Sequence, residues 1–223
     1  QPDEKVDVGV IAVVSGAGLQ RLFRNLGCVA LVHGGQTMNP SAQELMESVS
    51  SSGAASVIVL PNNSNIVSTA LQAEKLSDND IHVVQSRTIP QGVAALLAFN
   101  PELDLEKNLT LMEDAMTDVR SAEITTAIRS TSINGISVTK GQHIAVLEGK
   151  IVSVADTIAV VVRDLFTYLV PTSGSLVTLY WGGDVIEENA IEASDWIKVN
   201  FPEVEVEVDY GGQPLYHYLV SLE

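Results

Sequence analysis

The sequence predicts an α/β protein with two domains, a parallel sheet flanked by helices followed by a smaller mixed sheet with helices. Three observations support this. The first hundred residues alternate apolar, β-branched runs with segments of helical spacing. Strands that are separated by helices favour parallel pairing with right-handed crossovers. After residue 121 the chain changes to short strands joined by tight turns, which predicts an antiparallel meander.

The first domain, residues 1–100, is predicted from four strand–helix pairs. Val8–Val14 reads VGVIAVV, a continuous apolar run typical of a strand that is buried on both faces. Gly27 ends the helix that follows, and Pro40-Ser41 opens the next one. The expected elements are strands at 8–14, 29–32, 56–60 and 81–84, and helices at 19–26, 42–49, 66–76 and 89–99.

Residues 101–120 are predicted to form a connecting helix, because apolar residues recur at helical spacing between 103 and 119. The second domain, residues 121–223, is expected to hold the mixed sheet. The run 203–209 alternates acidic and apolar residues, which predicts an edge strand with one solvated face. The expected elements are strands at 123–132, 136–138, 142–146, 151–154, 176–180, 203–209 and 215–222, and helices at 158–170 and 187–199.

Composition excludes several classes of function. The 223 residues carry 12 Lys+Arg against 28 Asp+Glu, a formal net charge of −16, which repels phosphate and disfavours nucleic-acid binding. No apolar stretch is long enough for a membrane span. The single Cys28 rules out an internal disulfide, and with the absence of a signal sequence it predicts a cytoplasmic protein. The chain does not begin with Met, so we expect it to be part of a longer protein.

Four polar clusters follow the first four predicted strands, at 15–18, 34–41, 62–65 and 85–92. The carboxyl ends of parallel strands meet at one edge of a sheet, where ligands bind. Either these side chains cap helices and form turns, or they form a shared surface site for a partner or a carboxylate. The candidate binding residues are Gly34, Gly35, Gln36, Thr37, Asn39, Ser41, Asn62, Asn63, Ser64, Arg87 and Gln91.

Arg87 is the one cation in these clusters, so we expect it to contact an anion or carboxylate. A phosphate-binding GxxxxGK[ST] loop, a GxSxG nucleophile motif and metal-ligand spacing are all absent from the sequence, so no catalytic or metal residue is expected. A second candidate surface lies near the C-terminus, where glycines, a proline and three tyrosines fall together. Alternation predicts that its last two tyrosines share one face; the possible interface residues are Tyr210, Gln213, Tyr216 and His217.

Four motifs in order, GGQTMNPS (34–41), LPNNSN (60–65), SRTIPQG (86–92) and YGGQPLYHYL (210–219), carry a resemblance over nearly the whole chain. It resembles the C-terminal region of the bacterial fatty acid kinase A subunit family, once described as dihydroxyacetone-kinase-like. The resemblance implies that a kinase domain absent from this chain binds ATP and magnesium. It also implies that this region needs no cofactor itself and docks a DegV-type protein, whose fatty acid the kinase phosphorylates on its carboxylate.

The chain also looks like a distant DegV protein, which implies a DegV-like fold. Thr37 lies where DegV proteins carry TSQPS, and Asn62 or Asn63 replaces a serine of their second loop. The arginine of their LKKGGRI segment and the histidine of their terminal HTGPG have no counterpart. Losing both removes charge-assisted contacts to a carboxylate. A docking domain is therefore the main prediction; the alternatives are a DegV-type protein that binds a fatty acid or small carboxylate, and an enzyme domain.

Overall fold

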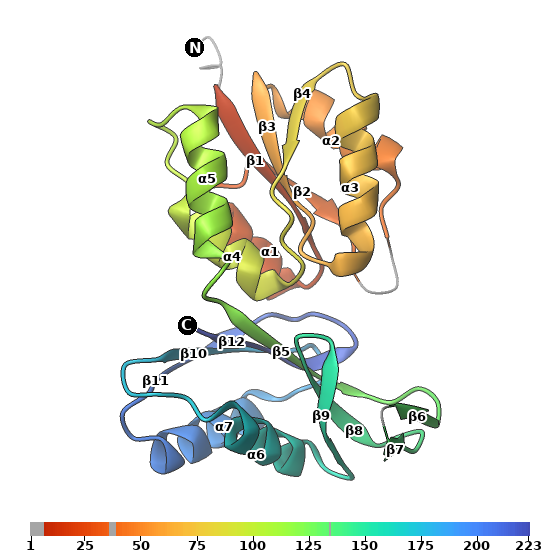
Figure 1. The fold of residues 1–223 in the computed structure, drawn as a ribbon, viewed down its shortest axis with the longest axis vertical. Coiled ribbons are helices and arrows are strands. Elements are labelled where there is room, and N and C mark those ends of the chain that lie inside the picture. Colours follow the sequence, from red (N-terminus) through yellow and green to blue (C-terminus); the bar gives the residue numbers. More distant parts are fainter. Residues whose placement is uncertain (1–6, 36–38, 134) are drawn as a thin grey trace. The chain divides into compact units, whose positions relative to one another are not determined.

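The computed structural model describes residues 7–35, 39–133 and 135–223 and divides into two compact units (Figure 1). The first unit holds Gln1–Ser15 and Leu19–Val119, and the second holds Gly16–Gly18 and Arg120–Glu223. Each unit has its own sheet and its own apolar core.

A four-stranded, fully parallel sheet forms the centre of the first unit, with the strand order β2-β1-β3-β4. The parallel sheet with alternating helices that the sequence predicts is confirmed. Branched residues such as Ile11 and Val57 fill the inside of this sheet, as expected for strands covered on both faces. The strands are β1 (Val8–Val14), β2 (Ala30–His33), β3 (Ser56–Leu60) and β4 (Asp80–Val83).

Helices cover both faces of this sheet (Figure 1). On one face, Leu45 of α2 and Ile66 of α3 pack against Ile11 and Val57. α4 contacts β1 and packs against α5. The helices of this unit are α1 (Ala17–Asn25), α2 (Ala42–Ser52), α3 (Ser64–Leu76), α4 (Ile89–Ala98) and α5 (Leu105–Ala115).

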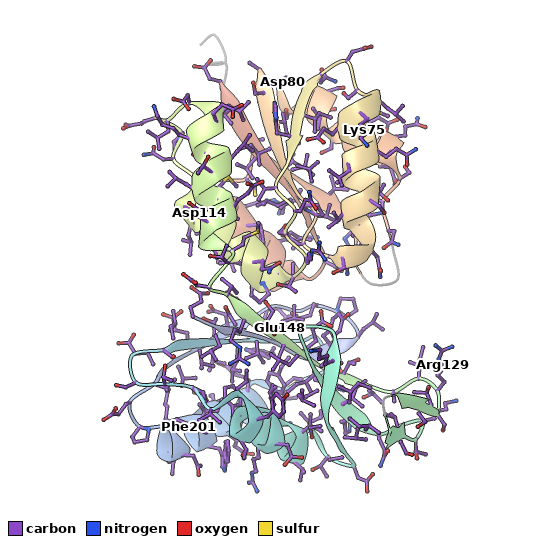
Figure 2. The ribbon with its side chains drawn as sticks, viewed as in Figure 1. Lys75, Asp80, Asp114, Arg129, Glu148 and Phe201 are labelled. Carbon is purple, nitrogen blue, oxygen red and sulfur yellow. The ribbon has the colours of Figure 1, made fainter. Side chains whose placement is uncertain are left out.

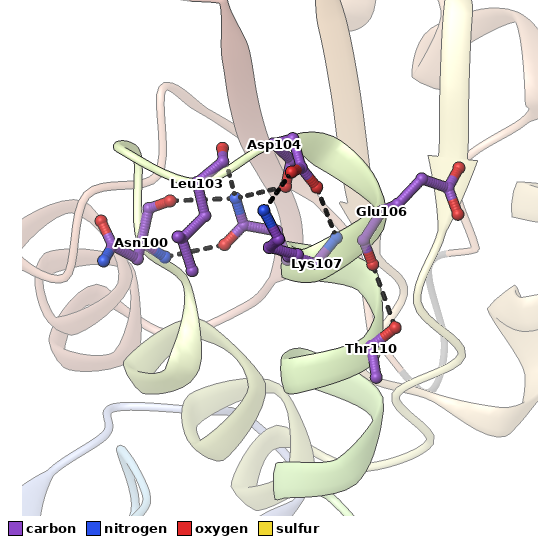
Figure 3. A network of polar contacts seen from close by, with 7 residues as sticks. Asn100, Leu103, Asp104, Glu106, Lys107 and Thr110 are labelled. Carbon is purple, nitrogen blue, oxygen red and sulfur yellow. Dashed lines mark hydrogen bonds and ion pairs between the residues drawn. The ribbon is translucent and has the colours of Figure 1, made fainter.

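The helix that the sequence predicts as a connector, within 101–120, is locked to the first unit by Asn108. This side chain is fully buried; its Oδ1 accepts from the Asn100 amide at 2.8 Å, and its Nδ2 donates to the Asn100 carbonyl at 2.9 Å. Asp104 caps the helix by accepting from the Lys107 amide (Figure 3). The turn between α4 and α5 is therefore fixed by hydrogen bonds, and α5 belongs to the first unit.

The second unit is a six-stranded mixed sheet with the order β11-β10-β12-β5-β8-β9. β10 and β11 pair in parallel and the other neighbours are antiparallel, which confirms the predicted mixed sheet. α6 (Ile158–Leu169) and α7 (Glu187–Asn200) lie on one face (Figure 1). The strands are β5 (Arg120–Thr126), β8 (His143–Leu147), β9 (Lys150–Ala155), β10 (Leu176–Trp181), β11 (Glu205–Tyr210) and β12 (Tyr216–Leu222).

An aromatic group anchors the helices of the second unit to its sheet. The ring of Phe201, labelled in Figure 2, lies 6.5 Å from that of Phe166 and 6.3 Å from that of Trp196. These spacings are in the range of favourable ring pairs. As predicted for the acidic run, β11 is an edge strand, and its Glu205 and Glu207 are exposed.

One predicted strand, 123–132, is divided in two. β5 ends at Thr126 because the backbone of Ala127 leaves the sheet to bond Gln142 and Gly141. The rest of the run forms β6 (Thr131–Ile133), which pairs with β7 (Ile136–Val138) as a separate ribbon. Within the described ranges, no helix is long and apolar enough to cross a membrane.

Candidate functional site

The carboxyl edge of the first unit's sheet brings together most of the residues predicted for the site. The loops after β2, β3 and β4 run directly into α2, α3 and α4, so the amino ends of three helices also lie at this edge. The chain passes from β1 to β2 on one side and returns to β3 on the other, which makes the space between the carboxyl ends of β1 and β3 the usual crevice for a ligand. Gln36 and Thr37 lie outside the described residues.

Asn62 closes this crevice with its own side chain. It is 5% exposed, and its Nδ2 donates to the carbonyl of Val13 in β1 at 3.2 Å. Ser86, fully buried, donates from Oγ to Asn62 Oδ1 at 2.7 Å and accepts from the Asn62 amide at 3.0 Å. The polar atoms of Asn62 thus bond the protein's own groups across the crevice.

The backbone around Asn62 is shaped to bring the side chain there. Its φ of 56° lies in the left-handed region, which asparagine tolerates better than most residues. Gly92 in α4 packs directly against it, and a Cβ added there would lie 1.9 Å from Asn62 Oδ1. Asn62, Ser86 and Gly92, called the crevice lock below, join loops that are 24 to 30 residues apart in the chain.

Several predicted site residues act as helix caps. Ser41 accepts from the Glu44 amide at 3.2 Å, and the Glu44 carboxylate accepts from the Ser41 amide, which completes a capping box. Hydrogen bonds from the Ser41 amide and hydroxyl lower the pKa of Glu44. Asn63 accepts from the Asn65 amide at 2.8 Å and so caps α3. The capping interpretation of these clusters therefore applies to Ser41 and Asn63.

Other predicted residues form an exposed rim around the lock. Asn39, Ser64 and Arg87 are exposed, whereas Gly34 is buried and Gly35 half-buried. Gln91 accepts from the Arg87 amide at 2.8 Å and so fixes the loop that carries the guanidinium. In the part of the chain that the structure describes, no ion pair involves Arg87. We define the rim as Asn39, Ser64, Arg87 and Gln91.

The opposite edge of the sheet is structural. Asp80, labelled in Figure 2, accepts from Ser56 Oγ at 2.6 Å, and its other oxygen lies 2.9 Å from His82 Nε2. These two hydrogen bonds lower the pKa of Asp80. They join the amino ends of β3 and β4.

The C-terminal candidate surface is only partly exposed. Gln213 is 3% exposed and donates to the Tyr180 carbonyl at 2.8 Å, and His217 is 8% exposed. Burial removes these two side chains from the surface that this chain presents. Tyr210 is 39% exposed, with its ring 4.5 Å from that of Trp181.

Tyr216 and Tyr218 do not share a face, so the alternation prediction is wrong there. The register of β12 against β5 shifts between these two residues, so Tyr216 pairs with Thr125 and Tyr218 with the adjacent Ile124. Tyr218 enters the core beneath the helices. Tyr216 instead hydrogen-bonds the carboxyl of Glu123, whose pKa is raised by burial and partly lowered again by this bond.

The same bulge creates a polar chain that sequence reasoning missed. Thr126 Oγ1 lies 2.7 Å from His217 Nε2 and 3.0 Å from His143 Nδ1. His217 Nδ1 lies 2.8 Å from Asp184 Oδ2, close but outside hydrogen-bond geometry. Burial, followed by the nearby His217, lowers the pKa of His143. No spacing in the sequence indicates this cluster, because its members lie on four different segments. Of the described residues, no group of His, Cys, Asp and Glu could hold a metal ion.

Comparison with known families decides what the chain is. The family model for the C-terminal region of FakA-like fatty acid kinase matches residues 9–223. The chain belongs to this family. Nearly the whole chain is covered, as the four sequence motifs imply.

Curated relatives of this FakA-like domain are longer proteins. Protein YloV of Bacillus subtilis is 36% identical over 222 residues, and a protein of Staphylococcus haemolyticus is 34% identical over 223. Each match covers 100% of this chain and 40% of the relative. The chain thus spans less than half the length of these relatives.

Solved structures show the fold of the FakA-like domain. A DegV family protein from Corynebacterium glutamicum superposes with a TM-score of 0.68 at 14% identity, covering 97% of this chain and 96% of that one. The Fak B3 protein of Streptococcus pneumoniae, loaded with linoleic acid, gives 0.60 at 10% identity, covering 97% and 99%. The dihydroxyacetone kinase of C. freundii gives 0.61 at 14%, covering 98% of this chain and 48% of that one. The fold is therefore DegV-like, as predicted.

Proposed function

We propose that this domain docks a DegV-type protein carrying a fatty acid, and that the rim at the carboxyl edge of the first unit contacts that partner. In this scheme a kinase domain outside the chain binds ATP and magnesium in the cytoplasm and phosphorylates the acyl carboxylate. The domain itself supplies binding and no catalytic group. Membership of the FakA-like family is the basis for this choice of partner.

The crevice lock is the observation that carries the proposal. In an open α/β sheet, a ligand enters the crevice where the strand order reverses. Here Asn62 occupies that space, and Ser86 and Val13 satisfy its amide. The polar groups that remain available lie outside the crevice, on an exposed rim. Such a rim suits contact with another protein better than enclosure of a small carboxylate.

Arg87 is the residue best placed to contribute binding energy. Its guanidinium is exposed and has no ion pair within the described ranges, and Gln91 holds its backbone. Arginine is enriched among the residues that dominate protein interfaces, because its donors match carboxylates and carbonyls well. The net charge of −16 further favours a partner with a basic face outside this contact, and binding should weaken as salt rises.

Native mass spectrometry tests the proposal. The 223-residue chain is measured alone and then mixed with a DegV-type protein from the same genome. A one-to-one complex supports docking. An acyl-sized adduct on the chain alone overturns the proposal in favour of fatty acid binding, and the absence of both overturns docking by this domain.

Calorimetry with two arginine variants then locates the surface. Arg87→Ala should weaken the dissociation constant about tenfold, because a hydrogen bond to a charged group is worth about 1.5–3 kcal/mol. Arg24 in the last turn of α1 is also exposed and serves as the matched control. Arg24→Ala should leave binding unchanged. Equal losses for the two variants would show that general charge, and not the rim, determines binding.

A further inference from the structure

A cavity of about 240 Å³ opens between α6 and α7 in the second unit. Its floor is apolar, formed by Val162, Val185 and Tyr218, which are 4%, 7% and 2% exposed. Ile158 and Trp196 contribute apolar walls. Ligand sites combine such a body with a few polar groups at the opening, and this volume is below the range of about 300–1,000 Å³ that drug-sized ligands occupy. The cavity therefore suits a small molecule.

The charged groups at the cavity are mainly acidic. Asp184 and Glu192 contribute carboxylates, and Arg163 is the cation among the lining residues. Both carboxylates act on the floor: burial raises the pKa of Tyr218 to about 12, and the negative charges of Asp184 and Glu192 add to that rise. The space above Tyr218 therefore has a negative potential.

The groups that could neutralise these carboxylates are engaged elsewhere or only loosely paired. The guanidinium of Arg163 lies 5.8 Å from the centre of the Trp196 ring, and none of the ion pairs found in the described part of the chain includes it. His217 approaches one oxygen of Asp184 outside hydrogen-bond geometry, and the Asp184 side chain is 53% exposed. Asp184 thus keeps acceptor capacity for a cation that enters from solvent.

We propose that this cavity binds a small organic amine, with its protonated nitrogen at Asp184 and Glu192 and its apolar, preferably aromatic, body on Val162, Val185 and Tyr218. Trp196 strengthens the choice, because an indole ring attracts cations and already does so with Arg163. An anion would meet two carboxylates and one arginine, and a neutral analogue would leave the carboxylates without a partner. This site is independent of the docking proposal, since its lining residues belong to the second unit and the rim to the first.

Three probes of the same size and shape test the charge preference. 2-Phenylethylamine, 2-phenylethanol and phenylacetate are titrated separately into the ¹⁵N-labelled chain, and amide shifts are followed by NMR. The amine should shift amides of α6, α7 and the loop of Asp184, in a saturable manner. The alcohol should bind more weakly, and phenylacetate should give no saturable shift there. Equal binding of the three probes, or shifts from the amine outside these segments, would overturn the proposal.

Charge-neutral variants locate the amine. Glu192→Gln and Asp184→Asn should each weaken binding of 2-phenylethylamine about three- to fivefold, the range expected for one exposed ion pair. Glu188→Gln is the matched control, since this exposed residue of α7 does not line the cavity. Glu192→Gln leaves the Asp184–His217 approach in place, so it keeps the test valid if Asp184→Asn disturbs the histidine. A loss for Glu188→Gln equal to that for Glu192→Gln would assign the effect to net charge and refute the site.

Discussion

Replacing Asn62 by alanine should destabilise the first unit by roughly 3–4 kcal/mol, a value that follows from three terms. The hydrogen bonds to Val13 and from Ser86 are lost, at about 1 kcal/mol each. Alanine at the φ of 56° adds a left-handed backbone penalty of about 1–2 kcal/mol. Asn62→Gly removes the same side chain without that penalty and should cost roughly 2 kcal/mol.

Urea unfolding followed by far-UV circular dichroism measures these differences. With a slope of about 1–3 kcal/mol per molar urea, Asn62→Ala should lower the midpoint by at least about 1 M. Both tryptophans, Trp181 and Trp196, lie in the second unit, so their fluorescence does not follow the first. Amide hydrogen exchange in peptides from β1 and β3 reads the first unit directly.

The control is Asn65→Ala, an exposed position in α3 that should change stability by less than about 0.5 kcal/mol. The reasoning fails if Asn62→Ala costs no more than this control, because the buried hydrogen bonds would then carry little energy. It also fails in part if the alanine and glycine variants are equally stable, since the backbone term would then be absent.

Three further predictions use the same preparations. Gly92→Ala places a methyl group against Asn62 and should destabilise the chain by about 1–3 kcal/mol in urea unfolding; combined with Asn62→Ala the losses should be less than additive, and strict additivity would contradict the lock. Burial raises the pKa of Glu123, so its contribution to stability is fully present below the unfolded pKa near 4.5 and is lost as pH rises through the folded pKa. Glu123→Gln, which keeps an acceptor for Tyr216, should therefore raise Tm at pH 8 but not at pH 4, and an equal effect at both pH values would exclude the burial explanation. Burial raises the pKa of the Cys28 thiol to about 12, so iodoacetamide at pH 8 should label Cys28 in urea but not in the native chain, as mass spectrometry can show.

The strands and helices were predictable because most of them are marked by their own residues. The runs VGVIAVV and SVIVL are apolar throughout most of their length, and β1 and β3 have the bounds that these runs predict. Ser41 and Pro40 similarly mark the start of α2, which the structure confirms with a capping box. Local patterns of this kind need no information from distant parts of the chain.

The parts that could not be predicted depend on partners far apart in the sequence. Asn62 is recognisable as a loop asparagine, but its side chain bonds Val13 and Ser86, which are 49 and 24 residues away. The bulge that separates Tyr216 from Tyr218 is set by pairing with β5, at a great distance along the chain. Asn108 reads as a polar residue of an amphipathic helix, yet it is the buried group that holds α5 to α4. Tertiary context decides each of these cases.

The crevice lock links the stability of the first unit to the proposed docking function. A surface that is already ordered loses less conformational entropy on binding, so a rigid rim gains affinity without extra contacts. Ser86 precedes Arg87 directly, so the hydrogen bonds of Ser86 to Asn62 restrain the segment that carries the guanidinium. Asn62→Gly should therefore weaken docking although Asn62 is buried and cannot touch a partner. If Asn62→Gly lowers stability but leaves affinity unchanged, the lock serves folding alone and the rim is not preorganised by it.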